Sequence, residues 1–194
     1  MTLPTQLTFL RFLLTFLIMG LLMVPGWPAK AAALACFLGA GLTDWLDGWL
    51  ARRWGQVSGL GALLDPIADK VLVLGVFLTF VQLRLIPAWM VLLIVLRELL
   101  ITGARLFAAS RGVVLAAARE GKQKAVSQMV TIIVILAVLV VREFFGPASI
   151  PEGLSRAMDW TVLGCLWLTV IFTLISGASF FWRHQAVLRD AAHR

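Results

Sequence analysis

The sequence has few charged residues for its length. Asp, Glu, Lys and Arg make up only 14% of its 194 residues, while 61% of the residues are hydrophobic. A soluble domain usually carries about 25% charged residues. This shortage excludes an ordinary soluble globular protein, and apolar runs close to the roughly 20 residues that cross a bilayer cover most of the chain. We therefore expect an integral membrane protein.

Cysteine is also scarce, and its placement gives no sign of a zinc site. Cys36 and Cys165 each lie inside an apolar run, without CxxC or other metal-type spacing. We interpret both as small buried hydrophobic residues. We expect no cleavable signal peptide, because Arg11 sits among apolar residues and no small-residue cleavage site follows it.

The net charge of +7 would suggest nucleic-acid binding in a soluble protein. In a membrane protein it indicates basic residues retained on the cytoplasmic side and attraction to anionic lipid headgroups. The expected partners are therefore membrane lipids, and no nucleic acid is expected.

Six long apolar segments follow one another along the chain. They cover about 8–25, 30–52, 60–81, 86–109, 124–142 and 158–182, and the breaks between them carry proline and glycine. Irregular backbone cannot face lipid, so each segment is predicted to be a helix. The sequence thus predicts an all-α, polytopic protein with six transmembrane helices, forming one domain over residues 1–194 without internal repeats.

Basic residues are unevenly divided between the two ends of these segments. One side carries ten of them: Arg11, Arg52, Arg53, Arg111, Arg119, Lys122, Lys124, Arg183, Arg189 and Arg194. The other side carries four: Lys30, Arg84, Arg142 and Arg156. Because basic loops stay in the cytoplasm, both termini are predicted to be cytoplasmic.

Four of the ten acidic residues fall between positions 44 and 69. A charged residue inside a span costs about 2.5–3.5 kcal/mol on insertion scales, so a cluster of four needs a partner of opposite charge. Helical spacing places Asp44 and Asp47 on one face of the second segment. Asp65 and Asp69 share a face of the third. A short link would bring all four to one shallow depth on the cytoplasmic side.

Carboxylates without nearby histidine or cysteine suit hard cations such as Mg²⁺ or Mn²⁺. A pair of ions would clamp the attacking and leaving oxygens of a phosphoryl centre. Small residues on the same two faces leave room for a nucleotide or diphosphate, and an arginine supplies a fork for phosphate; these are Gly48, Ala51, Gly61 and Arg52. A plain ion pair between Asp69 and Lys70, or between Arg97 and Glu98, is an alternative for those residues.

The pattern of these residues resembles the signature of the CDP-alcohol phosphotransferase family. It reads Asp44-x₂-Asp47-Gly48-x₂-Ala51-Arg52-x₈-Gly61-x₃-Asp65-x₃-Asp69. The resemblance implies six transmembrane helices, a homodimer, two divalent cations held by the four aspartates, and a nucleotide pocket formed by the small residues and Arg52. It also implies that Asp69 is the general base.

Other stretches extend the resemblance over nearly the whole chain, weakening after about residue 130. They include Leu3 to Thr8 with Arg11, Leu64 to Lys70, Arg97-Glu98 with Arg105, and Gly121 to Lys124. Phe16 stands where the family usually has proline, and Ala125 stands where it usually has threonine. These stretches imply transfer of a phosphatidyl group from CDP-diacylglycerol to glycerol 3-phosphate, giving phosphatidylglycerophosphate and CMP, at the inner membrane of a bacterium.

A dianionic acceptor needs a basic site. Arg97 and Arg105 share a face of the fourth segment, and Lys122 and Lys124 lie at the cytoplasmic start of the fifth. We expect Arg97, Arg105 and Lys122 to bind the acceptor phosphate, with Lys124 in support. Solvated positive-inside charges are the alternative interpretation of these residues.

Two other functions are alternatives to transfer onto glycerol 3-phosphate. Inositol phosphate, serine or phosphatidylglycerol could be the acceptor within the same family, the last giving cardiolipin. A divalent-cation transporter is the alternative of a different class, but a transporter would place its carboxylates near the bilayer midplane rather than at one surface.

Overall fold

The computed structural model describes residues 3–54, 59–113, 120–146 and 149–192, with side chains described for residues 9–43, 67–113, 123–146 and 149–185. Within these ranges the chain forms six α-helices and no strand. They are α1 (Leu3–Met23), α2 (Trp27–Trp54), α3 (Gly59–Gln82), α4 (Ala88–Ser110), α5 (Glu120–Phe145) and α6 (Glu152–Ala192). The predicted all-α fold is confirmed, and each of the six apolar segments corresponds to one helix.

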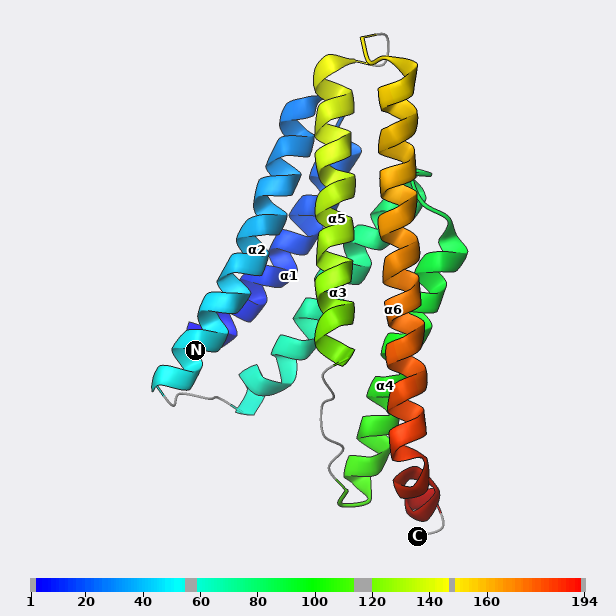
Figure 1. The fold of residues 1–194 in the computed structure, drawn as a ribbon. Coiled ribbons are helices and arrows are strands. Elements are labelled where there is room, and N and C mark those ends of the chain that lie inside the picture. The colour runs from blue at the N-terminus through cyan, green and yellow to red at the C-terminus, as the bar shows by residue number, and fades with distance from the viewer. Residues whose placement is uncertain (1–2, 55–58, 114–119, 147–148, 193–194) are drawn as a thin grey trace.

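The helices pack into one bundle, shown in Figure 1. α1 packs against α2 and α3; α5 packs against α2, α3 and α6; and α4 packs against α3 and α6. A continuous apolar core receives side chains from all six helices, among them Ile18, Phe37, Phe77, Ile94, Leu136 and Leu166. The two central helices, α3 and α5, therefore connect the remaining four.

Close helix contacts depend on small residues and on hydroxyl groups. A Cβ at Gly75 would lie 3.0 Å from Thr15 Cγ2, so glycine lets α3 approach α1. Between α5 and α6, Thr131 donates a hydrogen bond to the carbonyl of Cys165, and Thr169 donates one to the carbonyl of Ser127, both at 3.0 Å. Small residues and hydroxyl groups commonly join helices whose surroundings are as apolar as the helices themselves, because the hydrophobic effect does not drive such helices together.

Much of the outer surface is hydrocarbon. Leu92 and Leu99 on α4 are 63% and 64% exposed, and Trp160 and Trp182 on α6 are 72% and 78% exposed. In water, a surface with so many large apolar groups would be an aggregation hazard. By length and apolarity, two helical stretches within the described residues could cross a membrane, Gln123–Phe145 and Glu152–Gln185, and a shorter apolar stretch covers Phe9–Met23.

α6 is the longest helix, with 41 residues. At about 1.5 Å per residue it extends roughly 60 Å, about twice the hydrocarbon thickness of a bilayer. It begins six residues before the apolar segment predicted from the sequence. Polar residues on both sides of the apolar stretch continue the helix. α1 begins and α6 ends toward the same end of the bundle (Figure 1).

Lys30 corrects one sequence interpretation, because it is not a loop charge. Its side chain is buried in α2, and its Nζ donates hydrogen bonds to the carbonyls of Leu22 and Val24 at 2.6 and 2.8 Å. The last carbonyls of a helix lack partners within the helix, and a cation is favourable at that end. Lys30 therefore caps the C-terminus of α1.

Replacing Lys30 with methionine should lower the melting temperature of the purified protein in detergent. The change keeps an unbranched apolar side chain, one atom shorter, but removes both hydrogen bonds, at an expected cost of about 2 kcal/mol. Arg156→Met is the matched control, because Arg156 forms an exposed ion pair with Glu152, of a kind that contributes little. Equal melting temperatures for the two variants would contradict the capping role.

Candidate active site

Asp69 forms an ion pair with Arg11, which joins α3 to α1. Arg11 Nη1 donates a hydrogen bond to Asp69 Oδ1. The arginine side chain is only 4% exposed, whereas the aspartate side chain is 45% exposed. The cation is thus buried among the helices and holds a carboxylate that remains accessible. Arg11 was counted from the sequence among the surface charges, and its burial corrects that interpretation.

A cavity of about 310 Å³ lies beside this carboxylate, between α3, α4 and α5. Its lining residues are Asp69, Lys70, Val73 and Leu74 of α3, Glu98 of α4, and Lys124, Ala125, Gln128 and Met129 of α5. The fold therefore brings Asp69, the predicted general base, to the same cavity as Lys124, a predicted ligand of the acceptor phosphate.

Glu98 joins two cations at the wall of this cavity. Its Oε1 accepts a hydrogen bond from Lys124 Nζ of α5 and another, at 3.0 Å, from Arg97 Nη1. All three side chains are at most 12% exposed. Removing one partner from such a buried group typically costs about 3–5 kcal/mol, because the remaining charge is left uncompensated. Glu98 thus holds Arg97 and Lys124 close together against their mutual repulsion.

Arg97 is also fixed by α6. Its Nη2 donates a hydrogen bond to Ser176 Oγ at 2.6 Å. The neighbouring Gly177 leaves room for the arginine stem, because a Cβ at that position would lie 3.3 Å from Arg97 Cγ. α4, α5 and α6 therefore meet in one polar network next to the cavity.

Among the described residues, Lys70 forms no ion pair with its neighbour Asp69. Its Nζ donates a hydrogen bond to Thr102 Oγ1 of α4. Among the described side chains in and beside the cavity, four are cations and two are anions: Arg11, Lys70, Arg97 and Lys124 against Asp69 and Glu98. Lys70 and Lys124 thus give the cavity two basic lining groups, which suit a phosphate.

Several predicted site residues lie outside the described side chains. Their helices are nevertheless defined: α2 contains Asp44, Asp47, Gly48, Ala51 and Arg52, α3 contains Gly61 and Asp65, and α5 contains Lys122. Continuous helical backbone preserves the spacing that puts Asp44 with Asp47, and Asp65 with Asp69, on common faces. Among the described side chains alone, no group of three potential metal ligands is found.

Arg105 is placed differently from Lys124. It is exposed, and its guanidinium carbon lies 5.6 Å from the ring centroid of Phe180 on α6, as in a cation–π contact. It shares the interface between α4 and α6 with Arg97, but it is not among the residues that line the cavity beside Asp69.

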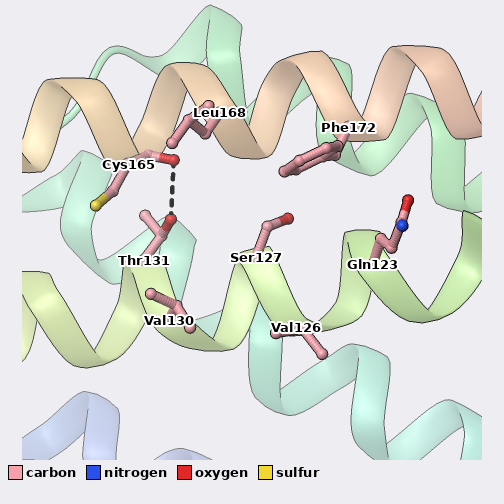
Figure 2. A pocket seen from close by; sticks show the side chains of 8 residues that line it. All are labelled: Gln123, Val126, Ser127, Val130, Thr131, Cys165, Leu168 and Phe172. Atoms are coloured by element: carbon pink, nitrogen blue, oxygen red, sulfur yellow. Dashed lines mark hydrogen bonds between the residues drawn. The ribbon is translucent and has the colours of Figure 1, made fainter.

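A second cavity, of about 460 Å³, lies between α5 and α6 (Figure 2). It is lined by Gln123, Val126, Ser127, Val130, Thr131, Cys165, Leu168 and Phe172. On α5 these positions alternate with those facing Asp69, so the two cavities lie on different faces of one helix. The mostly hydrocarbon lining suits an acyl chain better than a phosphate.

Sequence reasoning missed the contacts that complete the site. Arg11 and the Ser176 hydroxyl each lie inside an apolar run, and polar groups in such runs usually have a function or a partner. That signal was available, but it does not identify the partner. Arg11 and Asp69 are 58 positions apart, and Arg97 and Ser176 are 79 apart.

An all-helical bundle with a hydrocarbon exterior and a charged cavity inside it is the architecture of a membrane enzyme or transporter. Residues 1–175 match the CDP-alcohol phosphatidyltransferase family, and the chain belongs to this family. The resemblance found in the sequence is therefore confirmed.

Curated relatives cover nearly the whole chain. It is 35% identical to the CDP-diacylglycerol–glycerol-3-phosphate 3-phosphatidyltransferase of Bacillus subtilis (strain 168), over 97% of this chain and 98% of that protein. It is 30% identical to the protein of the same name from Cereibacter sphaeroides, with the same two shares covered. It is 38% identical to the one from Escherichia coli (strain K12), over 66% of this chain and 73% of that protein.

Proposed function

We propose that this protein transfers the phosphatidyl group of CDP-diacylglycerol to sn-glycerol 3-phosphate, giving phosphatidylglycerophosphate and CMP for phosphatidylglycerol synthesis. The names of its full-length relatives support this reaction. The structural observation that carries it is the cavity shared by the Asp69 carboxylate and the Lys124 amine. One group can accept a proton from a hydroxyl, and the other can bind a phosphate.

The donor set fits a divalent cation. Asp69 keeps an accessible carboxylate, and helical spacing places Asp65 one turn away on α3, while Asp44 and Asp47 share a face of α2. Oxygen donors of this kind suit Mg²⁺ or Mn²⁺. We propose that the four aspartates hold two such ions, which when bound would neutralise the diphosphate and stabilise the CMP leaving group.

The side chains of the chain itself perform the remaining steps. Asp69 accepts the proton of the attacking glycerol hydroxyl, and Arg11 fixes the orientation of that carboxylate. The hydroxyl oxygen forms a bond to the phosphorus that bears diacylglycerol, while the bond from that phosphorus to the CMP oxygen breaks.

Binding of the two substrates is assigned to separate groups of residues. Lys124 and Arg97, held together by Glu98, bind the acceptor phosphate, and Lys122 and Arg105 add positive charge on the approach to it. The nucleotide of CDP-diacylglycerol is proposed to lie against Gly48, Ala51, Arg52 and Gly61.

We further propose that all six helices cross the inner membrane of a bacterium, with both termini and the active site facing the cytoplasm. Basic residues are in excess on the side to which both termini are assigned, and such residues are retained in the cytoplasm. The family resemblance supports a homodimer. Reactivity of single introduced cysteines toward an impermeant reagent tests the orientation, and the molar mass in detergent tests the dimer.

An acceptor panel tests the proposed reaction. Purified protein with CDP-diacylglycerol and Mg²⁺ should release CMP with glycerol 3-phosphate. The rate should be at least about tenfold lower with serine or phosphatidylglycerol, because neither presents the dianionic phosphate that a basic pocket of this kind binds. Inositol phosphate is the most demanding comparison, since it too carries a phosphate. A faster rate with inositol phosphate would reassign the acceptor. Cation uptake into vesicles without CMP release would favour the transporter instead.

A further inference from the structure

Gln128 is a buried polar residue in the cavity for which the reaction outlined above has no role. It lies on α5, lines the cavity beside Asp69 and is 4% exposed. Its amide nitrogen has no hydrogen-bond partner among the described residues. An unpaired buried amide typically costs about 1–3 kcal/mol, and most such groups in proteins are satisfied. The missing partner therefore points to a ligand.

The position of Gln128 relative to its neighbours limits what that ligand group is. Gln128 follows Lys124 by four residues, so the two share a face of α5 and lie about 6 Å apart along the helix axis. Asp69 faces the same cavity from α3. The cavity thus offers three different groups: a cation, a neutral amide and a carboxylate.

Glycerol 3-phosphate carries three groups that match these three side chains. Its phosphate needs a cation, its terminal hydroxyl needs a proton acceptor, and its central hydroxyl needs a neutral hydrogen-bond partner. An amide can donate to or accept from a hydroxyl, and rotation about its terminal torsion exchanges the two amide groups. A phosphate would instead bind preferentially to the cations.

We propose that Gln128 binds the central hydroxyl of the acceptor and thereby selects a glycerol phosphate over a phosphate ester that lacks this hydroxyl. This inference rests on the proposed function. A pocket built to hydrogen-bond a hydroxyl discriminates strongly against analogues without it, because its buried polar group is then left unpaired.

The experiment compares glycerol 3-phosphate with 3-hydroxypropyl phosphate, which keeps the phosphate and the terminal hydroxyl but lacks the central one. The readout is kcat/KM for CMP release from CDP-diacylglycerol with each acceptor. The wild-type protein should prefer glycerol 3-phosphate by at least about tenfold. Gln128→Met should lower kcat/KM for glycerol 3-phosphate by about the same factor and leave that for 3-hydroxypropyl phosphate within about twofold, so that the preference disappears.

Gln123→Met is the matched control. Gln123 is on the same helix but is exposed and lines the cavity between α5 and α6, so this variant should keep the wild-type preference. An equal loss for both acceptors in Gln128→Met would overturn the proposal, because it would mean a structural role alone. If Gln128→Met does not fold, the wild-type comparison decides, since a wild-type protein without preference excludes selection by Gln128. Absence of any CMP release with glycerol 3-phosphate would instead refute the proposed function.

Discussion

Asp69→Asn should reduce kcat for CMP release by about 10²- to 10⁴-fold, the usual contribution of a general base. Asparagine has nearly the same shape as aspartate but cannot accept the proton of the attacking hydroxyl. Binding of CDP-diacylglycerol, measured by direct titration, should persist. Near-normal turnover in this variant would exclude Asp69 as the base.

The ion pair with Arg11 requires a control for folding. Without a carboxylate at position 69, the buried guanidinium of Arg11 loses an anionic partner, which should lower the stability of the fold. Asp69→Glu keeps a negative charge for Arg11 but moves the carboxylate by one methylene. It should melt close to the wild type and still lose most of its turnover. Asp159→Asn, at an exposed pair with Arg142, should retain full activity.

Chelation of divalent cations should abolish CMP release, and Mg²⁺ or Mn²⁺ should restore it. Without a cation, the diphosphate keeps its full charge and CMP becomes a poor leaving group. The helices should remain packed, because their core is hydrocarbon contributed by all six of them. Circular dichroism and the elution volume in detergent measure that packing. Full activity in the presence of chelator, with metal content verified as negligible, would refute the metal site.

Asp65→Asn gives a finer test of the same site. Losing one of four carboxylate ligands should raise the Mg²⁺ concentration for half-maximal activity by about tenfold or more, since site affinity depends on the number of charged ligands. Glu152→Asn, an exposed residue at the start of α6, should leave the Mg²⁺ requirement unchanged. A similar requirement in wild type and Asp65→Asn would remove Asp65 from the proposed ligand set.

The polar network explains how basic residues can be held at a site surrounded by hydrocarbon. Lysine at a membrane surface tends to extend its amine toward water, which would remove Lys124 from the cavity. The Glu98 carboxylate holds that amine inside, and Ser176 holds Arg97 from the other side. In the proposed acceptor site, this network would present Lys124, with Arg97 beside it, to the ligand phosphate before it arrives, so that less side-chain entropy would be lost on binding.

The sequence by itself determined the six helices and the family of the protein. Apolar length and the proline and glycine breaks are local properties, and they located all six helices to within about four residues, apart from the start of α1 and the ends of α6. The spacing of the aspartates was equally local, because helix periodicity alone puts Asp65 and Asp69 on one face. The same motif identified the family, which the comparisons confirmed.

Only the tertiary structure decided which helices meet and which charges pair. The apolar faces of membrane helices are chemically alike, so hydropathy cannot show that α1 packs on α3 or that α5 lies between α2 and α6. In the sequence, Arg11 and Lys30 were both counted simply as basic residues on one or the other side of the membrane. In the fold, Arg11 pairs with Asp69 and Lys30 caps α1. The partner of a buried charge depends on residues far away in the chain, and local periodicity carries no information about them.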